Sequence, residues 1–187
     1  MVEGFARQYD GSGPHYEVWY GKVDIAPERA LWFRYTTLDG VVSEAATWAV
    51  LFRGDDQVGG KDTYPLDSVA TGGEVAVPEG HESRRFRGLE TAFHNEGGHL
   101  DERNAIGEAG DVQWDLKWRD RGRSFSYVPH LLSRMKIARS TYDDCLLDLR
   151  MTGTIRYEDD VYEVDEVPGM LAHIQGTHMM GNSWGWS

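Results

Sequence analysis

The feature that most constrains the fold is a repeated alternation of apolar and polar side chains in short runs along the chain. Three such runs open the sequence, over residues 15–24, 31–38 and 44–53. Turn-forming residues, among them Pro27 and the Asp39-Gly40 pair, separate these runs. Because residues two apart lie on the same face of a β-strand, the alternation predicts strands rather than helices.

Further alternating runs follow along the rest of the chain. They cover residues 88–94, 111–118, 124–128, 144–157 and 161–164. Gly153 lies inside the longest of them and predicts a bulge or bend there. Residues 54–62 and 96–110 are rich in Gly and Asp and are predicted loops. One short helix or capped turn is expected over residues 128–137.

Many short strands with almost no helix predict an all-β fold, either an antiparallel barrel or a two-sheet sandwich. Aromatic side chains occupy both faces of several predicted strands. This arises in a closed barrel when one face packs outside and the other lines a cavity. A sandwich with one crowded core is the alternative. The length of 187 residues and the apolar content of 40% predict a single domain, residues 1–187, that buries a core.

The charge balance excludes some partners. The chain has 31 acidic and 19 basic residues, a net charge of −12, so we expect no nucleic-acid binding. No apolar run reaches the roughly 20 residues that a membrane helix needs, and residues 1–5 lack a secretory signal pattern. We therefore expect no integral membrane segment. Cys145 is the only cysteine, which fits a reducing, cytoplasmic location. High acidity with few lysines fits a halophilic source or an ordinary acidic protein equally well.

An ordered set of motifs points to one protein family. They are residues 15–20 (HYEVWY), 31–36 (LWFRYT), 44–52 (EAATWAVLF), 112–116 (VQWDL), 127–129 (YVP) and 168–173 (PGMLAH), followed by Gly176, His178, Trp184 and Trp186. Together they resemble the carotenoid hydratase or AttH-like lipocalin family. The resemblance implies a lipocalin-like antiparallel β-barrel, which is the fold we expect. It also implies a large apolar substrate and hydration, cyclisation or pericyclic chemistry without a metal or redox cofactor.

The resemblance also bears on domain organisation. Members of this family usually carry two barrels, and this chain is similar to the N-terminal one. It is expected to be either the first half of a two-barrel protein or a single-barrel member. Gln175 stands where the family pattern leads us to expect an aromatic residue.

Acid-catalysed hydration of an alkene needs a proton donor inside an apolar pocket and a means to stabilise the carbocation. The candidate proton donors are Asp115, Glu17 and His173. The candidate aromatic faces that line the ligand site and stabilise positive charge are Trp19, Trp32, Trp48, Trp114 and Trp118. The alternative is that these tryptophans form the barrel core and that the acids face solvent. Arg34 lies in mid-strand, either as an anchor for a polar ligand group or as a surface or ion-paired residue.

The C-terminal residues form a second group of candidates. Two histidines and two tryptophans, His173, His178, Trp184 and Trp186, fall within 14 residues, after a turn signal at Pro168-Gly169. Tryptophan is costly to leave exposed, so this segment is expected to dock. It is predicted either to line the ligand pocket or to form an interface with a second barrel domain or with a second copy in a homodimer.

Signatures of other enzyme classes do not occur. The stretch from His94 to His99 contains two glycines and is not a His-Glu-x-x-His helix, so no metal site is expected. The sequence has no nucleophile elbow, phosphate loop or dinucleotide fingerprint. We therefore predict a barrel that binds a hydrophobic small molecule, isoprenoid or polyketide-like, and that can hydrate, isomerise or cyclise it without a cofactor. A non-catalytic lipid carrier or a structural interaction domain is the alternative.

Overall fold

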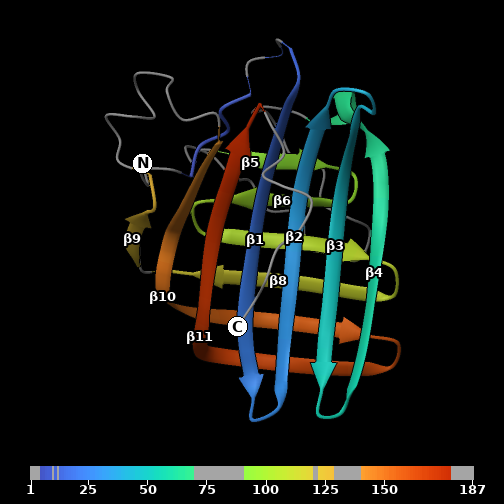
Figure 1. Ribbon diagram of the computed structural model, residues 1–187. Helices are drawn as coiled ribbons and strands as arrows, with labels where there is room; N and C mark the ends of the chain where they lie inside the picture. Colours follow the sequence, from blue (N-terminus) through green and yellow to red (C-terminus); the bar gives the residue numbers. More distant parts are fainter. Residues whose placement is uncertain are drawn as a thin grey trace.

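The computed structural model describes residues 5–9, 11, 13–69, 91–119, 122–128 and 140–177. Apart from one short 3-10 helix, η1 (Leu66–Ser68), the regular structure of these residues is all strand (Figure 1). The strands are β1 (His15–Ala26), β2 (Arg29–Asp39), β3 (Glu44–Arg53), β4 (Asp56–Pro65), β5 (Thr91–Asn95), β6 (Gly98–Asp101), β7 (Asn104–Ala109), β8 (Val112–Trp118), β9 (Arg123–Ser126), β10 (Ser140–Tyr157) and β11 (Asp160–Gly176). In the part of the chain described, no helix is long and apolar enough to cross a membrane.

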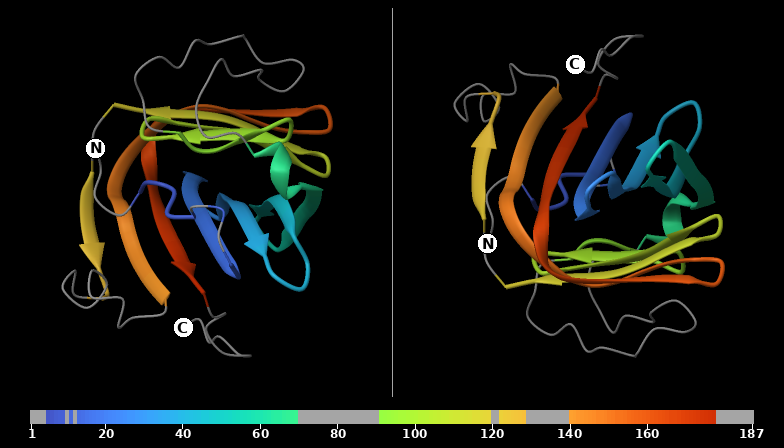
Figure 2. Two further views of the ribbon diagram at one scale, coloured as in Figure 1. Left: turned by 90° about the horizontal axis from the view of Figure 1, so that it is seen from above. Right: turned by 90° about the horizontal axis from the view of Figure 1, so that it is seen from below.

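All strands belong to one antiparallel sheet, in the order β4-β3-β2-β1-β11-β10-β8-β7-β6-β5, with β9 paired to β10. The sheet folds over on itself into two layers. β1 to β4 form the front layer in Figure 1, and β5 to β8 run across behind them. β10 and β11 curve from one layer into the other (Figure 2), and β3 and β4 contact β7 on the opposite side. The predicted all-β, lipocalin-like antiparallel barrel is confirmed.

The two longest strands, β10 and β11, make the corner between the layers. β10 pairs with β9 before the corner and with β8 after it, from Met151 onward. The register of β10 against β11 shifts between Met151 and Gly153, and Gly153 has a φ of 152°. Asp148 and Glu166 also take positive φ, at 58° and 52°. The bend predicted at Gly153 is therefore confirmed, since residues of this kind let a paired strand turn sharply.

The alternation of side chains explains where the core lies. In β1 and β2, Trp19, Val23 and Phe33 point between the layers and are buried. Trp114 and Leu116 of β8 meet them from the back layer. Each of these residues is separated from the next inward-facing one on its strand by an outward-facing position, as the period of two requires.

The loop predicted at residues 54–62 is wrong over most of its length, because β4 pairs with β3 along its whole span. Gly59 and Gly60 suggested a loop, but they serve close packing. A Cβ atom at Gly59 would lie 2.5 Å from the Ala49 carbonyl oxygen, and one at Gly60 would lie 2.6 Å from the Gly110 nitrogen. At both positions, glycine lets the backbone of another segment approach β4 closely.

The loop predicted at residues 96–110 is also wrong, because most of this stretch pairs as strands. This stretch forms the short strands β6 and β7. Gly98 and Gly107 lie under aromatic rings of the core: a Cβ atom at Gly107 would lie 2.4 Å from Trp114. The glycines make room for large side chains, so their presence did not indicate irregular backbone.

The turn expected at Pro168-Gly169 is also wrong, because both residues lie inside β11. Pro168 is opposite Arg150 of β10. β11 begins to pair with β1 only at Gly169, opposite Val23. Proline has no N–H to donate, and it is tolerated where a strand has a neighbour on one side only. The helix or capped turn predicted at residues 128–137 lies almost wholly outside the described residues.

Replacing Gly153 with alanine tests the corner. A Cβ atom there would lie 1.9 Å from the Asp115 carbonyl oxygen, and the φ of 152° is unfavourable for alanine. We expect Gly153→Ala to lower the free energy of unfolding by about 3 kcal/mol. Urea unfolding followed by circular dichroism measures it. Gly40→Ala is the control, because a Cβ atom at Gly40 meets nothing within 4 Å. Equal stability of the two variants would show that the corner tolerates a side chain.

Candidate functional site

The inward face of the front layer changes from apolar to polar along the barrel. At the end where β1 turns into β2, Val23 is opposite Leu31, and both are buried. At the other end, which we call the mouth, β1 begins and β11 ends. There Glu17 lies between Thr37 of β2 and Gln175 of β11. The strand period that buries Val23 therefore also turns Glu17 inward, six residues earlier on the same face.

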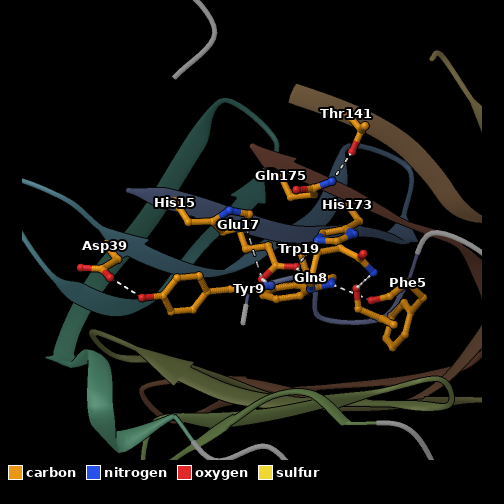
Figure 3. A network of polar contacts seen from close by, with 11 residues as sticks. Phe5, Gln8, Tyr9, His15, Glu17, Trp19, Asp39, Thr141, His173 and Gln175 are labelled. Atoms are coloured by element: carbon orange, nitrogen blue, oxygen red, sulfur yellow. Dashed lines mark hydrogen bonds and ion pairs between the residues drawn. The ribbon is translucent and has the colours of Figure 1, made fainter. Parts of the chain in front are cut away.

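Glu17 and His173 form a buried pair at the mouth (Figure 3). Nε2 of His173 lies 3.1 Å from Oε1 of Glu17, and the two residues are 1% and 0% exposed. Trp19 is directly opposite His173 in the ladder, and their rings stack with centroids 4.7 Å apart and planes 3° apart. The structure thus brings together three of the candidate residues: two proton donors and one aromatic face.

The residues ahead of β1 complete this site. We call residues 5–9 the N-terminal strap; they pass along the inward side of β1 (Figure 3). The backbone N–H of Gln8 donates to Oε1 of Glu17 at 2.5 Å, and that of Tyr9 donates to Oε2 at 3.2 Å. The Nε1–H of Trp19 donates to the carbonyl oxygen of Phe5 at 2.9 Å. Since an ionised carboxylate only accepts hydrogen bonds, N–H donors on both oxygens suit a charged Glu17.

Polar contacts at the rim hold the outer end of the strap. The Tyr9 ring stacks on His15 at 5.2 Å, and its hydroxyl donates to the carboxylate of Asp39. Hydrogen bonds from the Ser43 hydroxyl and then from Tyr9 lower the pKa of Asp39. His15 in turn lies 3.9 Å from Glu17, measured from its Nε2 to Oε2. These rim contacts place Tyr9 beside the buried carboxylate.

This arrangement is suited to proton transfer. A buried carboxylate that accepts a hydrogen bond from one ring nitrogen orients an imidazole and stabilises its charged form. Nε2 of His173 takes that role toward Glu17, so the carboxylate fixes the orientation of the ring. The indole of Trp19 lies against the same ring and offers an aromatic face to positive charge.

Two other candidate residues of β8 do not join this pair. Trp114 points inward and is buried in the back layer, where its Nε1–H donates to the Tyr35 hydroxyl at 2.8 Å. Asp115 follows it in the strand and points to the outer face, between the inward-facing Trp114 and Leu116. A catalytic role for Asp115 alongside Glu17 has no support in this geometry.

Arg34 and Trp48 also lie on the outer face. They are opposite each other in β2 and β3, and the Arg34 guanidinium is 5.3 Å from the Trp48 ring centroid. Lys61 approaches the same ring, with Nζ at 4.9 Å. Burial lowers the pKa of Arg34. The contact is a cation–π stack outside the barrel, not a ligand anchor inside it. His178, Trp184 and Trp186 lie outside the described residues.

Several residues at the mouth were not predicted from the sequence. They are Phe5, Gln8, Tyr9, Thr141 and Gln175. The strap precedes the first alternating run and has no periodicity that would reveal it. The sequence marks Gln175 only as a departure from the expected aromatic residue; its side-chain amide donates to the Thr141 hydroxyl at 2.8 Å. The departure itself was the signal, because it makes the mouth more polar.

A second buried polar group lies in the hairpin of β5 and β6. His94 and His99 are opposite each other, with ring centroids 5.6 Å apart. Nε2 of His99 is 2.8 Å from Asp101, which also accepts hydrogen bonds from the backbone N–H groups of Arg103 and Asn104. Asp101 thus stabilises the turn into β7. Across the described ranges, no cluster of three or more His, Cys, Asp or Glu side chains is arranged to hold a metal ion.

Comparisons with known proteins identify a related fold. No family model matches the sequence, and no curated protein matches it. Among solved structures, the chain is similar to a crystal structure of kievitone hydratase from Nectria haematococca, with a TM-score of 0.50 and 8% sequence identity. The match covers 96% of this chain and 52% of that one, so this chain spans about half the length of the hydratase. At this identity the similarity is one of fold.

The hairpin histidine leads to a pH prediction. Burial, and then the charge of His99, lower the pKa of His94 below its ordinary value of 6.5, although a backbone hydrogen bond at Gly98 opposes this. In the window just below 6.5 the unfolded chain therefore binds more protons than the folded chain. The contribution of His94 to stability is present above pH 6.5 and is lost as the pH falls through the lowered pKa.

We expect wild type to lose more stability than His94→Gln between about pH 7.5 and about pH 5. Urea unfolding at several pH values measures the difference. Parallel pH curves for the two proteins would contradict the prediction.

Proposed function

We propose that this barrel binds a large hydrophobic small molecule, isoprenoid or polyketide-like, and catalyses cofactor-free hydration or isomerisation of a carbon–carbon double bond. We further propose that the chain is a relative of the carotenoid hydratase or AttH-like lipocalins. One observation carries the proposal: Glu17 and His173 are buried as a pair beside Trp19, in a barrel whose core is mainly apolar. The likeness of the fold to that of kievitone hydratase, a hydratase by name, supports it.

The chemistry follows from the positions of these groups. Protonated His173 adds its proton to one alkene carbon, and the carbocation forms at the other carbon. The face of Trp19 stabilises that charge, and Glu17 stabilises the imidazolium and holds its orientation. A water molecule then forms the new C–O bond, and its proton returns to His173. Loss of a proton from the carbocation instead gives the isomerised alkene. In both reactions Glu17 acts through His173 and is a positioning residue.

The first test is binding, followed by turnover. Tryptophan fluorescence is titrated with a carotenoid, a prenylquinone and a fatty acid, at low and at molar salt. We expect saturable quenching by one class. Turnover of that class in ¹⁸O-labelled water should place one ¹⁸O atom in a hydrated product, whereas an isomerised product takes up none. Saturable binding without turnover of any bound class would favour the non-catalytic carrier and contradict the proposed chemistry.

Substitutions at the pair separate chemistry from binding. We expect His173→Gln and Glu17→Gln each to lower kcat by about 100-fold or more, because they remove the proton donor or its orienting charge. The dissociation constant of the quenching ligand should change much less. Glu163→Gln, an exposed carboxylate of β11, is the matched control and should keep its activity. Full activity of both Glu17→Gln and His173→Gln would exclude this pair from the reaction.

An interaction domain is the second candidate, and the outer face of the barrel favours it. The outward-facing residues Tyr20 and Tyr142 stack, with Tyr127 against Tyr142 at 4.6 Å and Phe125 against Tyr127 at 4.9 Å. Phe125 and Tyr127 are 55% and 56% exposed. The row thus runs from the buried Tyr20 to two exposed rings, and exposed aromatic rings are typical of a surface that contacts another protein.

The sequence predicts that Trp184 and Trp186 either line the ligand pocket or form an interface with a second barrel domain or with a second copy in a homodimer. The homodimer alternative has a direct test. Deleting residues 181–187 should then convert a dimer into a monomer, as measured by light scattering after size-exclusion chromatography. A deletion that leaves the mass in solution unchanged would contradict the predicted interface.

A further inference from the structure

We infer that the N-terminal strap, residues 5–9, occupies a ligand site at the mouth of the barrel, and that the ligand is an apolar ring compound bearing a hydroxyl group and a second oxygen. This inference rests on the proposed function, because it assigns the ligand of the same site. Three groups of the strap lie where such a ligand would bind: the Phe5 side chain, the Phe5 carbonyl and the backbone N–H groups of Gln8 and Tyr9.

The apolar part of the site is filled by Phe5. Its side chain is 0% exposed and belongs to the same core cluster as Trp19 and Trp114. Phe5 lies outside every strand, so no sheet pairing requires it to be there. A flat apolar ring that replaces Phe5 restores the burial that the core would otherwise lose, which is the main driving force for an apolar ligand.

The polar part of the site is set by two residues of β1. The Nε1–H of Trp19 is satisfied by the Phe5 carbonyl, and both oxygens of Glu17 are satisfied by N–H groups of the strap. Leaving a buried donor or acceptor unsatisfied costs about 1–3 kcal/mol, so a molecule that displaces the strap must replace these partners. An oxygen acceptor facing Trp19 and a hydroxyl donor facing Glu17 do so.

The attachment of the strap suits release. No backbone-to-backbone hydrogen bond joins residues 5–9 to the described strands. The backbone N–H groups of Gln8 and Tyr9 donate instead to a side chain, that of Glu17. At the rim the strap is held by the Tyr9 hydroxyl on Asp39 and by an Arg7 guanidinium donating to the Val69 carbonyl at 3.4 Å. Gly11 and Gly13 follow it with φ of 86° and 72°. Glycine takes positive φ without steric cost, so the backbone can change direction at these two positions ahead of β1.

The test uses 2-naphthol as the simplest probe, a flat apolar ring that carries the hydroxyl group but not the second oxygen. Its methyl ether, which cannot donate a hydrogen bond, is the comparison. Binding is measured by calorimetry on the full chain. We expect Phe5→Ala to bind 2-naphthol about tenfold more tightly than wild type, because the competing ring is gone. Phe125→Ala removes an exposed phenylalanine from the outer face and is the matched control; it should bind as wild type does.

Hydrogen exchange on the wild-type chain gives a second readout that does not depend on a variant. Saturating 2-naphthol should speed the exchange of the Gln8 and Tyr9 amides, since these leave Glu17 when the strap is displaced. The preference for 2-naphthol over the methyl ether should disappear in Glu17→Gln. Deletion of residues 1–9 should reproduce the tighter binding of Phe5→Ala.

Three results would overturn the inference. They are unchanged protection of the Gln8 and Tyr9 amides in the complex, no gain in affinity for a folded Phe5→Ala or strap-deleted chain, and no binding of 2-naphthol to wild type or any folded variant. None of these readouts involves turnover. Tight binding of 2-naphthol without hydration of any alkene would therefore contradict the proposed chemistry but still support the inferred ligand site.

Discussion

The buried carboxylate of Glu17 is the interaction on which the arrangement of the mouth depends. It joins three segments through side-chain contacts: β1, β11 through His173, and the N-terminal strap through Gln8 and Tyr9. A charge removed from water is tolerated only when it is paired and hydrogen-bonded, and removing a partner costs about 3–5 kcal/mol. The positions of the strap and of the His173 ring are therefore consequences of satisfying one side chain.

The folding-over of the sheet makes this carboxylate an interior group. β10 and β11 carry the backbone from one layer to the other, so the inward face of β1 is covered by the back layer instead of water. Tyr35 shows how closely the layers meet: its hydroxyl donates to the Ile106 carbonyl at 2.8 Å and accepts the Nε1–H of Trp114. Burial raises the pKa of Tyr35 well above its ordinary range, so it stays a neutral donor that joins the two layers.

Much of the fold could be predicted from local sequence, but little of the site. Alternation revealed β2 and β8 because their inward residues are large and apolar. It revealed β1 and β3 because large side chains, such as Tyr20 and Trp48, also alternate on their outer faces. It did not reveal β4, β6 and β7, where glycines make room for neighbouring backbone and rings. Glu17, Trp19 and His173 could be named as candidates from their chemistry. Their contact could not be predicted, since Glu17 and His173 are 156 residues apart and meet only through the pairing of β1 with β11.

A buried acid–base pair is a poor way to stabilise a barrel. Replacing such a pair with apolar residues of similar volume is often neutral or stabilising, so Glu17 and His173 add little that leucine would not. A carrier for apolar molecules needs only an apolar interior, which the far end of this barrel already has at Val23 and Leu31. The polar pair lies instead at the mouth, beside Trp19 and under a strap that satisfies both carboxylate oxygens. That placement suits a pair kept ready for a polar group of a ligand, with the strap holding its charge until the ligand arrives.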